Sequence, residues 1–185
     1  NRIQPISLPL SIDMQATMDK IFPPQLPSPN LYRMVARNEV LFKDLVESRF
    51  IGPTGLFDRK RLSPSLREKI ILRTCIATNN QYEFALHVET ISMKMGLNAE
   101  QIEDIKNATL DAKYWTAADL VLFDLIDNLI KRIEVPQDLF ERAKQHFPEE
   151  ELLEIVFITG LYTTIAMIVA LGKPDFDHYA EMRKE

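Results

Sequence analysis

The sequence predicts an all-α fold, a bundle of helices preceded by an extended, proline-rich arm. Only 5 of the 185 residues are glycine, and the residue types that favour helices are plentiful. No alternation of apolar and polar residues is long enough to predict a strand. With 46% hydrophobic and 26% charged residues, the composition is that of a globular domain.

Prolines are concentrated in the first 29 residues, which hold six of the eleven in the chain. Because proline fixes φ and removes a backbone donor, this stretch predicts an extended arm, with a possible short helix near residues 13–21. The arm also carries apolar side chains, so we expect it to lie against its own domain or a neighbouring subunit. We therefore divide the chain into an arm (1–29), a helical domain (30–177) and a C-terminal tail (178–185).

Seven helices are expected in the helical domain from capping residues and apolar periodicity. Ser63 and Pro64, for example, supply a capping hydroxyl and a proline at the first helical position. The expected helices cover residues 31–48, 63–79 and 81–95, followed by four that begin at residues 98, 116, 136 and 148.

The last of these helices contains a run without charged side chains, residues 155–171. A helix that spans a membrane needs about 20 apolar residues. This run is shorter and includes Gly160 and three threonines. We interpret it as a helix buried inside a soluble protein or oligomer, and we expect no membrane association.

The charge and the cysteine content of the chain argue against nucleic-acid binding and against chemistry that needs two cysteines. The net charge is −5 and no basic stripe with interleaved aromatic residues is present, so nucleic-acid binding is not expected. Cys75 is the single cysteine, which excludes an intrachain disulfide and a two-cysteine redox cycle within one chain. A lone cysteine fits a reducing compartment and no signal peptide is visible, so we expect a cytoplasmic protein. Phosphate-loop and dinucleotide motifs are missing from the sequence, and we expect neither a cofactor nor a metal.

Glu68 lies in register with an apolar face of the second expected helix. Side chains three and four residues apart share a face, so Glu68 stacks with Ile71 and Cys75. Because desolvating a carboxylate is costly, such a residue must be paired, hydrogen-bonded or neutral. A raised pKa would suit proton transfer near neutral pH. The alternative is that Glu68 lies at the edge of the stripe, where it pairs with a neighbouring arginine or meets water.

Glu83 and His87 are four residues apart on the third expected helix, so their side chains face the same way. A carboxylate that orients an imidazole gives a base of fixed tautomer. Two such residues are also potential metal ligands, but they predict no metal site without a third. The alternative is a pair on the helix surface without a catalytic role.

Two stretches that contain these residues, 62–73 and 80–87, resemble the signature region of the carboxymuconolactone decarboxylase family. Residues 29–34, 96–102 and 170–175 resemble its first helix, the start of its fourth helix and its closing motif. The resemblance covers roughly residues 27–177. It implies an alkylhydroperoxidase D-like helical protomer that assembles into trimers or hexamers, with pockets at the subunit contacts.

In the alkylhydroperoxidase D branch of this family, a glutamate, a Cys-x-x-Cys and a histidine form a dithiol peroxidase with a proton relay. The resemblance places Glu68 and His87 at the glutamate and histidine positions, whereas Asn80 and Glu83 occupy the two cysteine positions. The form Tyr82-Glu83-x-x-x-His87 is similar to the decarboxylase-like branch. Members of that branch act on lactones or cyclic acids by proton transfer.

Together these observations predict a small-molecule enzyme, a lyase that acts on a cyclic acid, a lactone or a carbonyl compound by acid–base chemistry. Glu68 is expected to donate or relay a proton, and His87 to act as acid or base with Glu83 as its partner. Asn80 and Tyr82 are expected to line the pocket.

Two alternatives to this enzyme stay open. In the first, Cys75 is the nucleophile of a one-cysteine peroxidase that an external thiol resolves, although its place on an apolar face is typical of an inert cysteine. In the second, the polar cluster is structural, and the protein is a non-catalytic oligomeric scaffold that binds a ligand or a partner.

Overall fold

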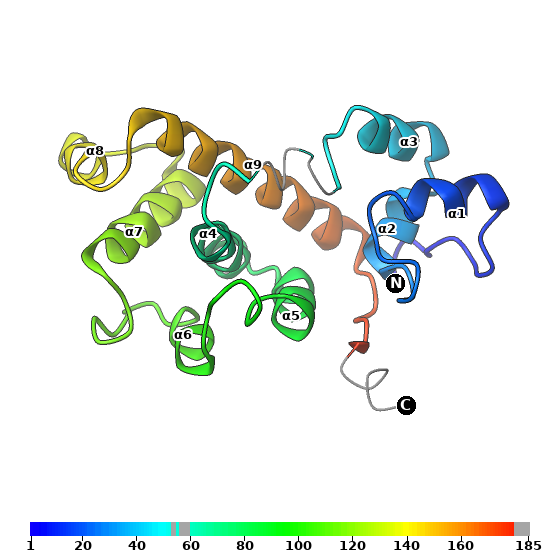
Figure 1. The fold of residues 1–185 in the computed structure, drawn as a ribbon, viewed down its shortest axis with the longest axis horizontal. Coiled ribbons are helices and arrows are strands. Elements are labelled where there is room, and N and C mark those ends of the chain that lie inside the picture. The colour runs from blue at the N-terminus through cyan, green and yellow to red at the C-terminus, as the bar shows by residue number, and fades with distance from the viewer. Residues whose placement is uncertain (53–54, 56–59, 180–185) are drawn as a thin grey trace. The chain divides into compact units, whose positions relative to one another are not determined.

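The computed structural model, drawn in Figure 1, describes residues 1–52, 55 and 60–179. Every regular element in these residues is a helix, which confirms the predicted all-α fold. Part of the loop after residue 49 and most of the predicted C-terminal tail lie outside the described residues. The helices are α1 (Ile12–Met18), α2 (Asn30–Val35), α3 (Glu39–Glu47), α4 (Pro64–Ala77), α5 (Gln81–Thr90), α6 (Ala99–Asp104), α7 (Ala117–Arg132), α8 (Gln137–Lys144) and α9 (Glu149–Gly172).

The chain divides into two compact units, and the division falls within α9. The first unit contains Asn1–Lys60 and Ile168–His178, and the second contains Arg61–Met167 and Tyr179–Glu185. The predicted boundaries of arm, domain and tail remain predictions, and the units are described separately below.

The first unit holds the N-terminal arm together with α1, α2 and α3. Its core contains Met14, Met18, Phe42 and Val46, and apolar arm residues pack against them. Arg33 fastens the arm, because its guanidinium donates to the carbonyls of Ile6 and Ser28 at 2.8 and 3.3 Å. Of the two partners expected for the arm, its own domain or a neighbouring subunit, the structure shows the arm packed against the helices of its own unit.

The helix predicted over residues 31–48 is wrong in one respect, because the structure divides it into α2 and α3. Asn38 separates the two helices, because its side chain accepts from the backbone N–H of Leu41 and caps α3. Asn30 is the first residue of α2, and the carboxylate of Asp177 accepts from its backbone N–H at 3.2 Å. A capping residue inside an apolar repeat thus outweighed the periodicity.

In the second unit, α4 lies between α5 and α7, and α7 packs against α8. Ser63 caps α4 with Pro64 at its start, and Thr116 forms the capping box that begins α7, as the sequence predicted. Fully buried apolar residues fill the core between the helices: Ile70, Ile71, Leu72, Leu122, Ile126 and Ile155.

The third predicted helix, residues 81–95, is shorter in the structure, where α5 ends at Thr90. The backbone N–H groups of Ile91 and Ser92 both donate to the carbonyl of His87, at 2.8 and 3.0 Å. This shared acceptor converts the last part of the predicted helix into a turn over residues 91–96, which Gly96 closes at φ +99°.

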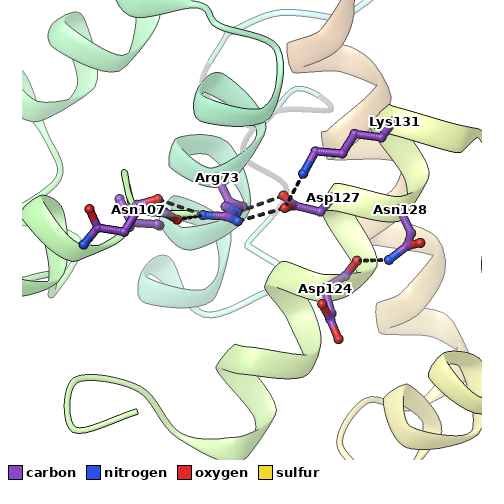
Figure 2. A network of polar contacts seen from close by, with 7 residues as sticks. Arg73, Asn107, Asp124, Asp127, Asn128 and Lys131 are labelled. Carbon is purple, nitrogen blue, oxygen red and sulfur yellow. Dashed lines mark hydrogen bonds and ion pairs between the residues drawn. The ribbon is translucent and has the colours of Figure 1, made fainter. Parts of the chain in front are cut away.

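A buried ion pair between Arg73 and Asp127 holds α4 to α7 (Figure 2). The guanidinium of Arg73 donates to both carboxylate oxygens of Asp127 at 2.9 and 2.8 Å. It also donates to the carbonyls of Ile105 and Asn107, at 2.9 and 3.0 Å, in the segment that follows α6. Lys131 reaches the same carboxylate from the solvent side at 2.9 Å. One side chain therefore connects three segments of the unit.

Helix α9 is long and apolar enough to cross a membrane by length and composition alone. An 18-residue window of it has a mean hydropathy of 2.1, and 39% of that window is buried. One such helix is weak evidence for a membrane protein, because the core helix of a soluble protein meets the same criteria.

Candidate active site

The centre of the candidate site is a buried contact between Glu68 on α4 and His87 on α5. Glu68 is completely buried, and its carboxylate oxygens lie 3.0 and 3.2 Å from Nδ1 of His87. His87 is 8% exposed. The two side chains therefore meet away from bulk water, and the closest contacts of Glu68 are not those of an edge residue paired with a neighbouring arginine.

Two further side chains lie at the opposite nitrogen of the imidazole. Oε1 of Glu83 is 3.5 Å from Nε2 of His87, and the hydroxyl of Tyr162 on α9 is 3.3 Å from the same atom. The rings of His87 and Tyr162 are arranged edge to face, with centroids 5.5 Å apart. His87 is thus held at both nitrogens by groups from three helices.

Ser92 completes the surroundings of Glu68. Its hydroxyl donates to Oε1 of Glu68 at 2.6 Å, and the side chain is completely buried. No pattern in the sequence connected Ser92 or Tyr162 to Glu68 and His87. Ser92 is in a segment predicted as helix, and Tyr162 is 75 residues from His87, so no spacing rule connects them.

The pKa of His87 is raised from 6.5 to about 10. Burial alone would lower it, but the charge of Glu68, its hydrogen bond to Nδ1 and the contributions of Glu83 outweigh that effect. Burial would likewise raise the pKa of Glu68, yet the charge and hydrogen bond of His87, the hydroxyl of Ser92 and the charge of Arg67 lower it overall. At neutral pH the pair is a carboxylate and an imidazolium.

The pKa of Glu68 is therefore lowered, whereas a raised pKa would have suited proton transfer by Glu68 near neutral pH. The sequence left three states open for a buried Glu68, and a raised pKa belongs to the neutral one, because desolvation disfavours the charged form. In the structure the carboxylate lies against the protonated imidazole of His87 and the hydroxyl of Ser92, and these two donors favour the charged form more strongly.

The contribution of the Glu68–His87 pair to folding stability should be greatest between about pH 4.5 and 6.5. The pKa of His87 is raised, so its contribution is complete below 6.5 and is lost as the pH rises to about 10. The pKa of Glu68 is lowered, so its contribution is complete above 4.5 and is lost at more acidic pH. Urea unfolding at pH 6 and pH 9.5 should show this loss in the wild type and a smaller one in Glu68→Gln. Equal losses in both proteins would contradict the assignment.

Asn80 and Glu83 each present a buried polar atom that has no hydrogen-bond partner among the described residues. These atoms are Nδ2 of Asn80 and Oε2 of Glu83, and both residues are 3% exposed. The other amide atom of Asn80, Oδ1, accepts from the backbone N–H of Glu83 at 3.3 Å and caps α5. Tyr82 is buried on the same helical turn, at 4% exposed. Buried polar groups are normally paired, so these two atoms are exceptions within the site.

Cys75 is buried in α4 at 1% exposed. Burial and the charges of Glu83 and Glu68 raise the pKa of its thiol well above the ordinary value. Because the thiolate is the reactive form, we expect native Cys75 to react with a thiol reagent at least about 100-fold more slowly than the denatured chain. A colorimetric thiol assay with and without urea measures this ratio, and rapid labelling of the native protein would contradict it.

The described residues contain no group of three or more histidine, cysteine, aspartate or glutamate side chains arranged to hold a metal ion.

Residues 51–123 match the Carboxymuconolactone decarboxylase family. No curated protein matches the chain significantly in sequence. A protein of unknown function from Agrobacterium tumefaciens, for which an antioxidant-defence role of the AhpD type has been suggested, is similar in structure. Its TM-score is 0.66 at 20% identity, over 78% of this chain and 96% of that protein.

Two other solved structures cover nearly the whole chain. An uncharacterized peroxidase-related protein from Silicibacter sp. has a TM-score of 0.76 at 15% identity, over 97% of this chain and 94% of its own. A cysteine-to-alanine variant of the debrominase Bmp8, in complex with 2,3,4-tribromopyrrole, has a TM-score of 0.74 at 12% identity, over 100% and 97%. At these identities the likeness concerns the fold. The match over residues 51–123 and the AhpD-like helical fold both support the resemblance of this chain to the carboxymuconolactone decarboxylase family.

Proposed function

We propose that this protein is an enzyme that catalyses proton transfer on a small carbonyl, lactone or carboxylate compound, with decarboxylation as one form of that chemistry. The observation that carries the proposal is the imidazole of His87, fixed at both nitrogens between Glu68 and Glu83 in a buried cluster. Such a group is oriented for proton transfer and is removed from competing water.

His87 acts in this proposal as an acid rather than as a base. With a pKa of about 10 its imidazole carries a proton at neutral pH. A buried imidazolium stabilises negative charge that develops on a carbonyl or carboxylate oxygen, and it can deliver a proton to an enolate. Glu68 keeps His87 charged and does not itself need to meet the substrate.

Glu83 and Asn80 are the groups that we assign to the substrate. The free Oε2 of Glu83 can accept a proton or a hydrogen bond, and the free Nδ2 of Asn80 can donate to a substrate oxygen. A compound with a carbonyl or carboxyl oxygen beside an acidic C–H or O–H matches this donor and acceptor. Tyr82 is proposed as a wall of the same pocket on account of its burial beside them.

The peroxidase alternative has less support. The similar structures include a peroxidase-related protein, but at 15% identity this concerns the fold. The single cysteine is buried, and its pKa is raised, which opposes a nucleophilic thiolate. A purely structural role for the cluster does not account for two buried polar atoms without partners.

The test is proton exchange in D₂O. The protein is incubated with a panel of ketones, 2-oxo acids and unsaturated γ-lactones, and ¹H NMR follows loss of the exchangeable C–H signal or of the carboxyl group. We expect exchange or conversion within one compound class and none with His87→Ala. Failure with every class would contradict the proposal, and dithiol-dependent consumption of a hydroperoxide would favour the peroxidase.

We further propose that the enzyme is a homo-oligomer, a trimer or hexamer, in the cytoplasm. An exposed apolar face of α9 supports the oligomer: Leu153, Phe157 and Met167 are 61%, 61% and 65% exposed. Val156 and Gly160 lie on the same face, and a Cβ at Gly160 would meet nothing within 4 Å. An apolar stripe of this kind is typical of a helix that packs against another protein surface.

Phe157→Glu should shift the protein toward the monomer by placing a charge in that face. Sedimentation velocity of wild type and variant measures the shift. Val40→Glu is the matched control, because Val40 is 71% exposed on α3 and its substitution should leave the oligomer unchanged. A wild-type protein that is monomeric at high concentration would refute the oligomer.

A further inference from the structure

We propose that Ser92 is a positioning residue that holds the carboxylate of Glu68 against Nδ1 of His87. The inference rests on the proposed function in one respect, since it gives Ser92 a role in catalysis through those two residues. Ser92 itself touches neither the unpartnered atom of Asn80 nor that of Glu83 in the contacts described above.

The first argument is the scarcity of donors around Glu68. Its side chain is completely buried, and its hydrogen bonds come from two groups, Nδ1 of His87 and the hydroxyl of Ser92. Both donors reach Oε1, at 3.0 and 2.6 Å. Without Ser92, one donor would remain to fix the rotation of a buried carboxylate, and its two oxygens lie at nearly equal distances from that donor.

The second argument is the way in which Ser92 is anchored. Its backbone N–H donates to the carbonyl of His87 at 3.0 Å, and its own carbonyl accepts from Met95 and Leu97 at 3.2 and 3.3 Å. The serine is thus bonded to the backbone of His87 and to the carboxylate that holds the ring of His87. The turn that ends α5 closes a ring of contacts through Ser92, Glu68 and His87.

The third argument is chemical. A serine hydroxyl is a donor without charge, so it strengthens the ionised form of Glu68 and adds no competing ion pair. The charged and titratable groups facing this pair are Arg67 and Cys75 from α4, Glu83 from α5 and Tyr162 from α9. Arg67 acts on the ionisation of Glu68 through its charge, whereas Ser92 acts on it through a hydrogen bond.

The experiment is a titration of the histidine rings by NMR in Ser92→Ala. The chain has three histidines, and the His87→Ala variant identifies the signal of His87. We expect the midpoint of His87 to fall by roughly one pH unit, because a carboxylate that Ser92 no longer holds in place contacts Nδ1 of His87 less closely. An unchanged midpoint in a folded Ser92→Ala protein would overturn the proposal.

Two further variants keep the test decisive. Ser92→Cys keeps a side chain of similar size with a weak donor, and it serves if the alanine variant does not fold. Its midpoint should also fall, and an unchanged midpoint would again refute the positioning role. Thr159→Val is the control, because Thr159 is buried with a hydroxyl that has no partner among the described residues, so the His87 midpoint should stay unchanged.

The titration needs no substrate, so it separates this inference from the proposed function. If no compound is turned over but the His87 midpoint falls in Ser92→Ala, the positioning role stands and the proposed activity fails. If a substrate is found, kcat of Ser92→Ala should fall more than KM changes, and the alkaline limb of its pH profile should move to lower pH. A change in KM alone would oppose the positioning role.

Discussion

Replacing His87 by alanine should lower turnover of the compound found in the exchange screen by about 10²–10⁴-fold, the usual contribution of a positioned acid or base. The imidazolium is the group in the buried cluster that carries a proton at neutral pH and has both nitrogens oriented. Steady-state kinetics of the purified variant measure the effect. Sedimentation velocity and circular dichroism verify that the assembly and helices persist.

Glu68→Gln is the companion to this variant. The amide keeps the size of the side chain but removes the charge that holds His87 protonated, so turnover should fall by about 10²-fold or more. His146→Ala is the control, since His146 is exposed and lies outside the cluster. Full activity of either His87→Ala or Glu68→Gln would refute the assigned roles, whatever the behaviour of the control.

Replacing Arg73 by methionine should destabilise the second unit by about 3–5 kcal/mol, the usual effect of removing one partner of a buried ion pair. Arg73 is 5% exposed and donates to the carboxylate of Asp127 and to two backbone carbonyls (Figure 2). The substitution leaves three acceptors short of a donor at the junction of α4, α7 and the segment after α6. Chemical denaturation of both proteins measures the difference.

Lys131→Ala provides the matched control for Arg73. Lys131 bonds to the same Asp127 carboxylate at 2.9 Å, but its side chain is 61% exposed. An exposed ion pair contributes roughly 0–1 kcal/mol, so this variant should unfold at nearly the wild-type denaturant concentration. Equal effects of the two substitutions would show that burial does not decide the strength of these contacts.

Much of the fold could be predicted from local signals. Ser63, Asn98 and Thr116 were predicted to begin helices, and each does so through a side-chain oxygen that accepts from the first turn. The two errors have one cause in common. The break at Asn38 and the early end of α5 both depend on single hydrogen bonds that an apolar repeat does not encode.

The sequence predicted several residues of the candidate site, but it predicted less about their charges and their contacts with one another. Helical spacing placed Glu83 beside His87, and the stripe on α4 indicated that Glu68 is buried. The sequence did not show that Glu68 and His87 bond to each other across two helices, nor that Ser92 and Tyr162 join them. Those contacts depend on packing between segments, and they lower the pKa of Glu68.

The unpartnered atoms of Asn80 and Glu83 imply a trade between stability and function. A buried polar group without a partner weakens a folded protein by about 1–3 kcal/mol, so the ligand-free fold is less stable than an apolar site would make it. A small molecule that bonds to both atoms recovers this cost as binding free energy. Because it binds the folded state, it raises the melting temperature of the protein by mass action. Compounds that raise the melting point of wild type but not of Glu83→Leu would therefore identify the ligands that this pair of atoms selects.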